Sequence, residues 1–171
     1  MPRLSQGFPP IAQPDAKVLI LGSLPGRMSL QMQQYYAQPQ NAFWKIMGAL
    51  VGAGPELPYA ERTRHLVESR VALWDVCHAA LRPGSLDAAI DVTSVIPNDF
   101  QAFFATHPGI ELVCLNGGTA AKLYARLVVP TLSSAIRAVR TERLPSTSPA
   151  HAALRFAQKL ERWQIIRTIL G

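Results

Sequence analysis

Four short segments with strand-like patterns of apolar residues punctuate the chain, and each ends at a turn or polar residue. They are residues 17–22 (KVLILG), 71–76 (VALWDV), 111–115 (ELVCL) and 137–144, where apolar and basic residues alternate. A continuous apolar run predicts a strand covered on both faces, whereas alternation predicts a strand that is more exposed. We therefore expect three central strands and a fourth, partly exposed one.

Segments with helical spacing separate these runs. Residues 41–51 carry apolar side chains at helical spacing, and Asn41 precedes them as a candidate cap. Residues 59–69 have an amphipathic pattern, and another helix is expected after Asn116, beyond two glycines. The last helix is expected to start with Ser148 as N-cap and Pro149 at its first position, and to continue, whole or broken, to the C-terminus.

Strands that alternate with helices favour a parallel sheet with helices on both faces, because parallel strands need crossover connections. In such sheets, ligands bind beyond the carboxyl ends of the strands. The predicted site therefore lies in the loops that begin at Gly22, Asp75, Asn116 and Leu144.

The composition is that of one compact domain. The chain has 171 residues, of which 49% are hydrophobic and 16% charged, which excludes a disordered chain. We expect a single domain over 1–171 with an extended N-terminal segment at 1–16. No apolar stretch is long enough to cross a membrane and no targeting segment is recognisable. We therefore expect a soluble, cytoplasmic monomer without a membrane partner.

The cysteines and histidines do not form a metal-binding pattern. Cys77 and Cys114 match no zinc or iron–sulfur spacing, and the four histidines are scattered along the chain. Buried free thiols are the interpretation that this spacing favours. We expect neither a metal nor a cofactor.

The net charge is +6, from 17 basic and 11 acidic residues, and it is unevenly distributed. Residues 120–171 contain nine basic and two acidic residues, whereas residues 1–119 contain eight basic and nine acidic ones. Such a basic sector suits a polyanion such as nucleic acid. On charge alone, a solvated cationic face explains it equally well.

Three motifs could carry chemistry, and each also has a purely structural explanation. The loop GSLPG at 22–26 lets backbone N–H groups approach a ligand, or is only a turn. The segment YYAQPQNAFW at 35–44 places aromatic rings beside amides, as base-binding pockets do, or supplies core residues and a cap. The segment LPSTSP at 144–149 offers hydroxyls to a phosphate at a helix N-terminus, or merely caps that helix.

The order of these motifs, with WDVCHAALRPGSLD at 74–87 and LNGG at 115–118 between them, resembles the uracil-DNA glycosylase superfamily. The likeness covers residues 17–153 and is greatest to the hypoxanthine-DNA (deoxyinosine) glycosylase branch. It implies an α/β fold, a three-layer α/β/α sandwich with a central, largely parallel four-stranded sheet. It also implies a pocket for a flipped base at the strand ends, DNA with deaminated or mismatched bases as the partner, and no cofactor.

The resemblance also implies a role for each motif. Asn41 would be the catalytic residue that orients water toward the sugar, and Phe43 would stack on the base. Asn116 would pair with the lactam edge that hypoxanthine and uracil share. Backbone groups of the 22–26 loop would contact the departing base, and the last motif would hold DNA. The loop residues are Ser23, Leu24, Pro25 and Gly26, and the DNA-contacting residues are Ser146, Thr147, Ser148 and His151.

Two departures from other branches concern the mechanism. Mismatch-specific relatives carry a water-positioning Asn where this chain has Leu24, and the main uracil glycosylases carry a His where it has Leu144. No Asp lies between Gly22 and Gly26. We expect a monofunctional DNA glycosylase of base excision repair that removes hypoxanthine first and uracil second. The alternatives are a uracil-selective or G:U/G:T mismatch-selective glycosylase and, from another class, a non-catalytic nucleic-acid-binding module of the same fold.

Three polar residues of the 74–87 stretch, Asp75, Arg82 and Asp87, have no assigned step. We expect Arg82 and Asp87 to form a pair that organises the fold. The recognised motifs contain no lysine, so a Schiff-base mechanism is not expected.

Overall fold

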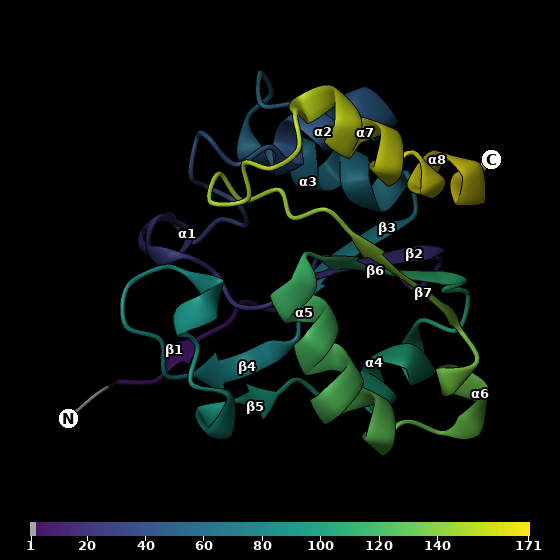
Figure 1. Ribbon diagram of the computed structural model, residues 1–171. Coiled ribbons are helices and arrows are strands. Elements are labelled where there is room, and N and C mark those ends of the chain that lie inside the picture. Colours follow the sequence, from purple (N-terminus) through teal and green to yellow (C-terminus); the bar gives the residue numbers. More distant parts are fainter. Residues whose placement is uncertain (1–2) are drawn as a thin grey trace.

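The structure is a computed structural model that describes residues 3–171. Its centre is a four-stranded sheet in which every neighbouring pair is parallel (Figure 1). In spatial order the strands are β3 (Val71–Asp75), β2 (Val18–Gly22), β6 (Leu112–Asn116) and β7 (Arg140–Leu144). The predicted α/β class and four-stranded parallel sheet are confirmed.

The three apolar strands are buried on both faces because alternate side chains enter two separate cores. On β2, Leu19 and Leu21 pack into one hydrophobic cluster, whereas Val18 and Ile20 pack into the other. Side chains alternate across a strand, so a strand between two helical layers must be apolar at every position.

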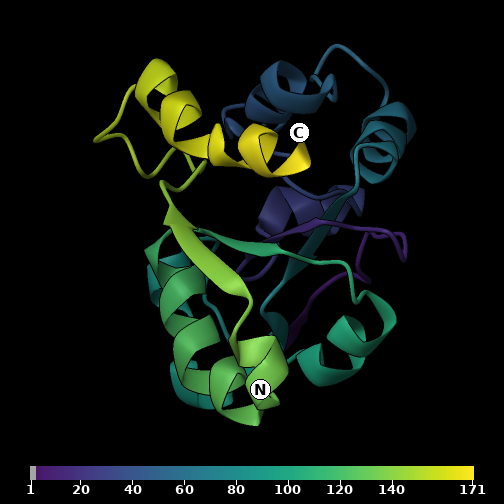
Figure 2. The same ribbon diagram turned by 90° about the vertical axis from the view of Figure 1, so that its right-hand side faces the viewer.

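Helices cover both faces and complete the three layers (Figures 1 and 2). Above the sheet in Figure 1 lie α2 (Phe43–Val51), α3 (Tyr59–Glu68), α7 (Phe156–Trp163) and α8 (Ile165–Leu170). Below it lie α4 (Phe100–Thr106), α5 (Gly118–Leu123), its π-helical and 3-10 continuations η3 (Tyr124–Val128) and η4 (Val129–Thr131), and α6 (Ser134–Arg137).

Several elements were not predicted from the sequence. A small antiparallel sheet, ordered β1-β4-β5, consists of β1 (Ser5–Gln6), β4 (Cys77–Ala80) and β5 (Ile96–Pro97). The short helices α1 (Arg27–Met32), η1 (Asp87–Ala89) and η2 (Val92–Ser94) were also missed. Elements of two to six residues are too short for their periodicity to stand out.

The segment expected to be extended, 1–16, is largely irregular but is attached to the fold. Ser5 and Gln6 pair with β4, and Ile11 forms a bridge to Leu73 of β3. Residues 1 and 2 lie outside the described residues.

Two expected elements begin later than the sequence predicts. The strand expected over 137–144 begins at Arg140, and residues 134–137 are helical. Leu112, where β6 begins, pairs with Arg140, so β6 offers no partner to the residues before Arg140.

The helical segment expected from Pro149 onward begins only at Phe156, with α7, and α8 follows it. The Ser146 hydroxyl accepts a hydrogen bond from the Ser148 N–H, and the Ser148 hydroxyl accepts one from the Ala150 N–H. These local turns compete with helix formation. The anion site expected at a helix N-terminus beside Ser148 is therefore wrong, because no helix begins there.

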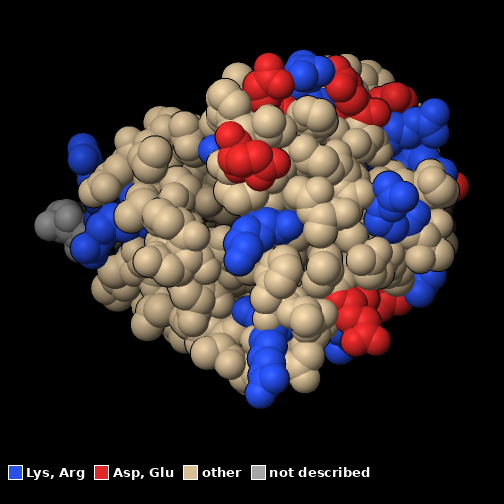
Figure 3. All heavy atoms as spheres, turned by 90° about the horizontal axis from the view of Figure 1, so that it is seen from above, with Lys and Arg blue, Asp and Glu red and all other residues tan. Residues whose placement is uncertain are grey.

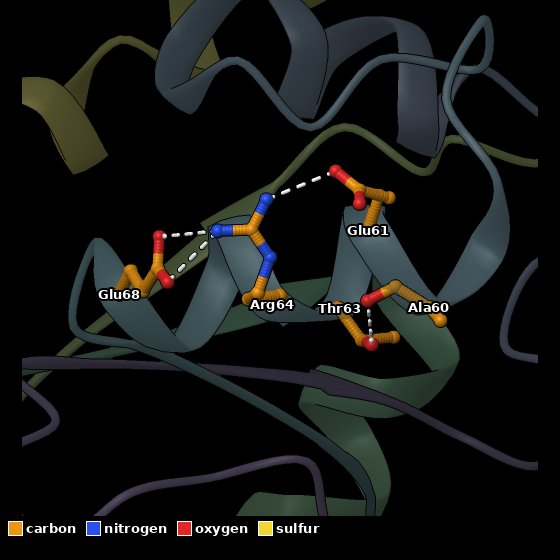
Figure 4. Close-up of polar contacts among 5 residues, drawn as sticks. All are labelled: Ala60, Glu61, Thr63, Arg64 and Glu68. Atoms are coloured by element: carbon orange, nitrogen blue, oxygen red, sulfur yellow. Dashed lines mark hydrogen bonds and ion pairs between the residues drawn. The ribbon is translucent and has the colours of Figure 1, made fainter.

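Helix α3 confirms the amphipathic pattern, and its solvent-facing side carries an ion-pair cluster. Arg64 lies between Glu61 and Glu68, at 2.9 Å and 3.0 Å (Figure 4). These side chains are about half exposed, and such surface pairs contribute little to stability because water screens them. No helix within residues 3–171 combines the length and apolar character needed to cross a membrane.

Candidate functional site

Three segments far apart in the sequence meet at the carboxyl edge of the parallel sheet. The Thr147 N–H donates to Asn116 Oδ1, and Asn116 Nδ2 donates to Thr147 Oγ1, both at 3.0 Å. The Ala42 N–H donates to the Thr147 carbonyl, also at 3.0 Å. The NAFW turn, the end of β6 and the loop after β7 are thus joined by hydrogen bonds.

Asn41, the candidate cap, lies two residues before helix α2: the N-cap is Ala42, and the helix begins at Phe43. The Asn41 side chain is half-buried, and its Oδ1 accepts the Phe43 N–H at 2.9 Å. A carbonyl oxygen has two lone pairs, so this bond leaves one acceptor position open. The amide can therefore support the helix start and still bind a small polar molecule.

Phe43 is fully buried, and the ring of Tyr36 covers it. The two ring centroids are 4.1 Å apart and the ring planes are inclined by 25°, which is a stacked arrangement. The Tyr36 hydroxyl accepts a hydrogen bond from Asn116 Nδ2 at 3.1 Å. Tyr36 belongs to the aromatic segment at 35–44, but its pattern in the sequence predicts no contact with Phe43 or Asn116.

The 22–26 loop is held on the side that faces β3 and β4. The Val76 N–H donates to the Gly22 carbonyl at 2.8 Å, and the Cys77 N–H donates to the Ser23 carbonyl at 3.0 Å. The guanidinium of Arg82 donates to the carbonyls of Leu24 and Pro25. The Leu24 side chain packs into the hydrophobic cluster below the sheet and therefore does not face a ligand.

Gly22 allows the close approach of two polar side chains. A Cβ atom at this position would lie 2.5 Å from Asp75 Oδ1 and 2.8 Å from the Tyr36 hydroxyl oxygen. Both distances are below van der Waals contact. Any larger residue at position 22 would clash with these side chains. Glycine therefore allows Asp75 and Tyr36 to lie at the same corner of the site.

Asp75 is a buried carboxyl group at this corner, with 4% of its surface exposed. Its Oδ2 has no hydrogen-bond partner among the described residues. Burial raises the pKa of the Asp75 carboxyl to about 7; the negative charge of Asp87 adds to this rise and Arg82 opposes it. The expected Arg82–Asp87 pair is present at 4.0 Å, with the Arg82 side chain buried.

The candidate DNA-contacting residues of the loop after β7 differ in how deeply they are buried. Thr147 is buried, whereas Ser146 and Ser148 are half-buried and His151 is exposed. Gly117 has a φ of +93°, and a Cβ there would lie 2.9 Å from the Ser146 Cβ. The glycine after Asn116 thus permits the loop to pack against the end of β6.

Several residues of the basic sector, 120–171, form bonds to other groups of this chain. Arg137 donates to the carbonyls of Val129 and Pro130, Arg167 donates to the Leu50 carbonyl, and Arg140 pairs with Glu142. Lys159 is buried and donates to the His151 carbonyl. Seen from above, basic side chains lie in separate places with acidic ones among them (Figure 3). The distribution of charged side chains on this face therefore does not indicate where the candidate site lies.

No group of three or more His, Cys, Asp or Glu side chains within residues 3–171 is placed to hold a metal ion. Both cysteines are buried free thiols, as the spacing predicted. The arrangement offers hydrogen-bonding amides, stacked rings and a buried carboxyl, which suit recognition of a flat polar ring.

Comparisons with known proteins agree with this arrangement. The family model of the uracil DNA glycosylase superfamily matches residues 9–167. The chain is 33% identical over 165 residues to a hypoxanthine DNA glycosylase of Methanosarcina acetivorans, covering 95% of this chain and 98% of that one. It is 37% identical over 113 residues to a hypoxanthine DNA glycosylase of Methanosarcina barkeri, covering 66% and 70%.

A solved structure shows the same fold. The solution NMR structure of a candidate uracil DNA glycosylase from Methanosarcina acetivorans superimposes with a TM-score of 0.80 and 31% identity, covering 99% of this chain and all of that one. The family match over nearly the whole chain, together with the convergence of its motifs at one edge of the sheet, shows that the chain belongs to the uracil DNA glycosylase superfamily.

Proposed function

We propose that this DNA glycosylase hydrolyses the N-glycosidic bond of hypoxanthine, and secondarily uracil, in DNA and leaves an abasic site. One observation carries the proposal. The hydrogen bonds of Thr147 bring the Asn41 turn, the Phe43 ring and the Asn116 amide to one edge of the sheet. The relatives named for hypoxanthine support the choice of base.

Asn41 would orient the attacking water. Departure of a base leaves an oxocarbenium-like sugar, which water can capture without a covalent enzyme intermediate. The free lone pair of Asn41 Oδ1 would accept a hydrogen bond from that water while the other holds the Phe43 N–H. A neutral amide suffices because it positions the nucleophile and does not itself attack.

Phe43 and Asn116 would bind the extruded base. Stacking on an aromatic ring contributes about 1–3 kcal/mol per base, and flipping itself costs a few kcal/mol. A donor from Asn116 suits the carbonyl of a lactam edge, which adenine and cytosine replace with an amino group. Mispaired targets should be preferred because their bases leave the stack more easily.

The base leaves with developing negative charge, and the 22–26 loop would stabilise it through backbone donors. The Arg82 guanidinium donates to the carbonyls of Leu24 and Pro25 and so fixes the backbone of this loop. A fixed backbone donor contributes on the order of 3 kcal/mol in better-studied oxyanion sites.

Duplexes with a single deoxyinosine or deoxyuridine opposite each normal base test the proposal. Alkaline cleavage of the product strand reports abasic sites, and anisotropy reports binding. Asn41→Ala should lower excision by orders of magnitude while duplex binding persists. Asn41→Ser should lose excision equally but keep an acceptor for the Phe43 N–H, so it should keep more thermal stability. Undiminished excision by both variants would refute the role of Asn41.

The same substrates separate the alternatives. Excision of uracil without hypoxanthine would establish a uracil- or mismatch-selective enzyme, and binding without any excision would establish a binding module. Borohydride should trap no protein–DNA adduct, because hydrolysis by water forms no Schiff base. A trapped adduct would show that the enzyme is not monofunctional.

A further inference from the structure

A cleft beside the 22–26 loop is lined by basic and polar side chains, with no acidic one among the described residues. Its volume is about 410 Å³, within the range of about 300–1,000 Å³ that is usual for ligand sites. Three segments form its walls: β1, helix α1 and the loop after β4. The lining residues are Ser5, Arg27, Leu30, Gln31, Arg82 and Gly84.

Arg82 joins this cleft to the 22–26 loop. It is buried, and its guanidinium donates to the carbonyls of Leu24 and Pro25. Asp87 lies 4.0 Å from it and opposes part of its charge. The Arg82 Nε has no hydrogen-bond partner among the described residues. A buried cation with an unpartnered donor favours the approach of an anion.

Arg27 is the exposed cation of the cleft. It is the first residue of α1 and directly follows the 22–26 loop. Its backbone N–H donates to Ser85 Oγ at 3.1 Å, which joins α1 to the loop after β4. Within residues 3–171, no acidic side chain lies within ion-pair distance of its guanidinium. The charge of Arg27 is therefore available to a ligand.

The chemistry of the lining suits a phosphate group. A guanidinium offers a planar fork of N–H donors that matches phosphate oxygens, and the Ser5 hydroxyl and the Gln31 amide add further donors. Arg27, Gln31 and Gly84 are exposed, so the cleft is open to a chain that continues past it. We propose that this cleft binds a backbone phosphate next to the flipped nucleotide of the DNA, with Arg27 as its cationic contact.

This proposal rests on the proposed function, which places the departing base against the 22–26 loop that Arg27 follows. Phosphate contacts fix the register and orientation of a protein on DNA, so Arg27 would help to align the target nucleotide with the site. The basic sector, 120–171, does not include Arg27. Acidic and basic residues nearly balance over residues 1–119, so the net charge of that part does not indicate this contact.

The experiment is a double-mutant cycle between Arg27 and individual phosphates. Non-cleavable duplexes carry 2′-fluoro-deoxyinosine and one uncharged methylphosphonate, placed in turn at each phosphate within two nucleotides of it. Arg27→Gln should bind the unmodified duplex about fivefold more weakly, as expected for an exposed ion pair. One methylphosphonate should weaken wild-type binding by about the same factor and have no effect on Arg27→Gln. Anisotropy titrations measure each dissociation constant.

Two further variants separate the cleft from general electrostatics. Gln31→Glu is nearly isosteric and places a carboxylate four residues after Arg27, where it can pair with the guanidinium along the helix. It should reproduce the loss of Arg27→Gln at the same phosphate although Arg27 is still present. Arg70→Gln is the matched control, because Arg70 is also exposed but precedes β3 at the opposite edge of the sheet. It should leave the affinity unchanged.

Additive losses at every position would overturn the phosphate site, because each methylphosphonate would then weaken Arg27→Gln as much as the wild type. Unchanged affinity of Gln31→Glu would overturn it as well. The proposed function fails separately, through absence of deoxyinosine excision by the wild type. Wild-type excision combined with additive losses would overturn only the phosphate site. The substituted side chains of Arg27 and Gln31 are exposed, so both variants should fold.

Discussion

Asn116 and Thr147 form two reciprocal hydrogen bonds across the ends of adjacent parallel strands. The N–H of Thr147 donates to the Asn116 side-chain oxygen, and the Asn116 side-chain nitrogen donates to the Thr147 hydroxyl, each at 3.0 Å. Both residues are buried, so water cannot readily replace either bond. The pair fixes the plane of the Asn116 amide and the position of the loop after β7 together.

Removal of the Thr147 hydroxyl should therefore destabilise the protein. Thr147→Val keeps the shape of the side chain but leaves one Asn116 donor unpaired, which costs about 1–3 kcal/mol in a buried place. Thr147→Ser keeps the hydroxyl and should lose less. Chemical denaturation of the three proteins measures the difference, and equal stability of the valine and serine variants would contradict it.

The buried Asp75 carboxyl should make stability depend on pH in a definite direction. Its pKa in the folded protein, about 7, lies above the ordinary value for aspartate of about 4. Between these two values the folded state holds a proton that the unfolded state has released. Stabilisation by the protonated carboxyl is therefore complete below about pH 4 and is lost as the pH rises to about 7.

Asp75→Asn should remove this dependence. Relative to the variant, the wild type should lose roughly 1 kcal/mol of unfolding free energy per pH unit between about pH 4 and pH 7. Denaturation curves at several pH values test this difference, in which titrations of other groups largely cancel. A constant difference across that range would show that Asp75 is ionised throughout in the folded protein.

The buried parallel strands and the motif positions could be predicted because their signals are local. An apolar run such as that of β2 identifies a strand buried on both faces, and the order of the motifs identified the family. The contacts of Tyr36 could not be predicted, because they join it to Phe43, seven residues away, and to Asn116, eighty residues away. The late start of α7 could not be predicted either. Serine residues before a helix can cap it or form local turns, and in this chain Ser146 and Ser148 form turns.

Arg82 should contribute more to the free energy of unfolding than Arg64, which is exposed although its ion pairs are shorter. Its buried guanidinium donates to the carbonyls of Leu24 and Pro25, so Arg82→Ala leaves two carbonyls of the loop without that donor. We expect a loss of about 2–3 kcal/mol, since hydrogen bonds to charged groups are among the stronger ones. The control Arg64→Ala removes only exposed pairs and should leave stability nearly unchanged. Similar losses in the two variants would contradict this role.

The salt dependence of DNA binding should locate the DNA-contacting arginines. Arg143 is exposed near the carboxyl end of β7, and its guanidinium lies close to Gly118 at the candidate site. Arg137 is also exposed but precedes the amino end of that strand and bonds to the carbonyls of Val129 and Pro130. Only the first is placed to meet a phosphate of DNA whose base enters the site.

Each phosphate contact releases counterions and adds about 0.9 to the slope of log affinity against log salt concentration. Arg143→Ala should therefore lower the magnitude of the slope by about 0.9, whereas Arg137→Ala should leave it unchanged. Anisotropy titrations of a non-cleavable duplex over a range of salt concentrations measure both slopes. A larger change for Arg137→Ala would place the DNA at the opposite end of the sheet, away from Asn116, and a slope near zero for the wild type would show that phosphate contacts do not drive binding.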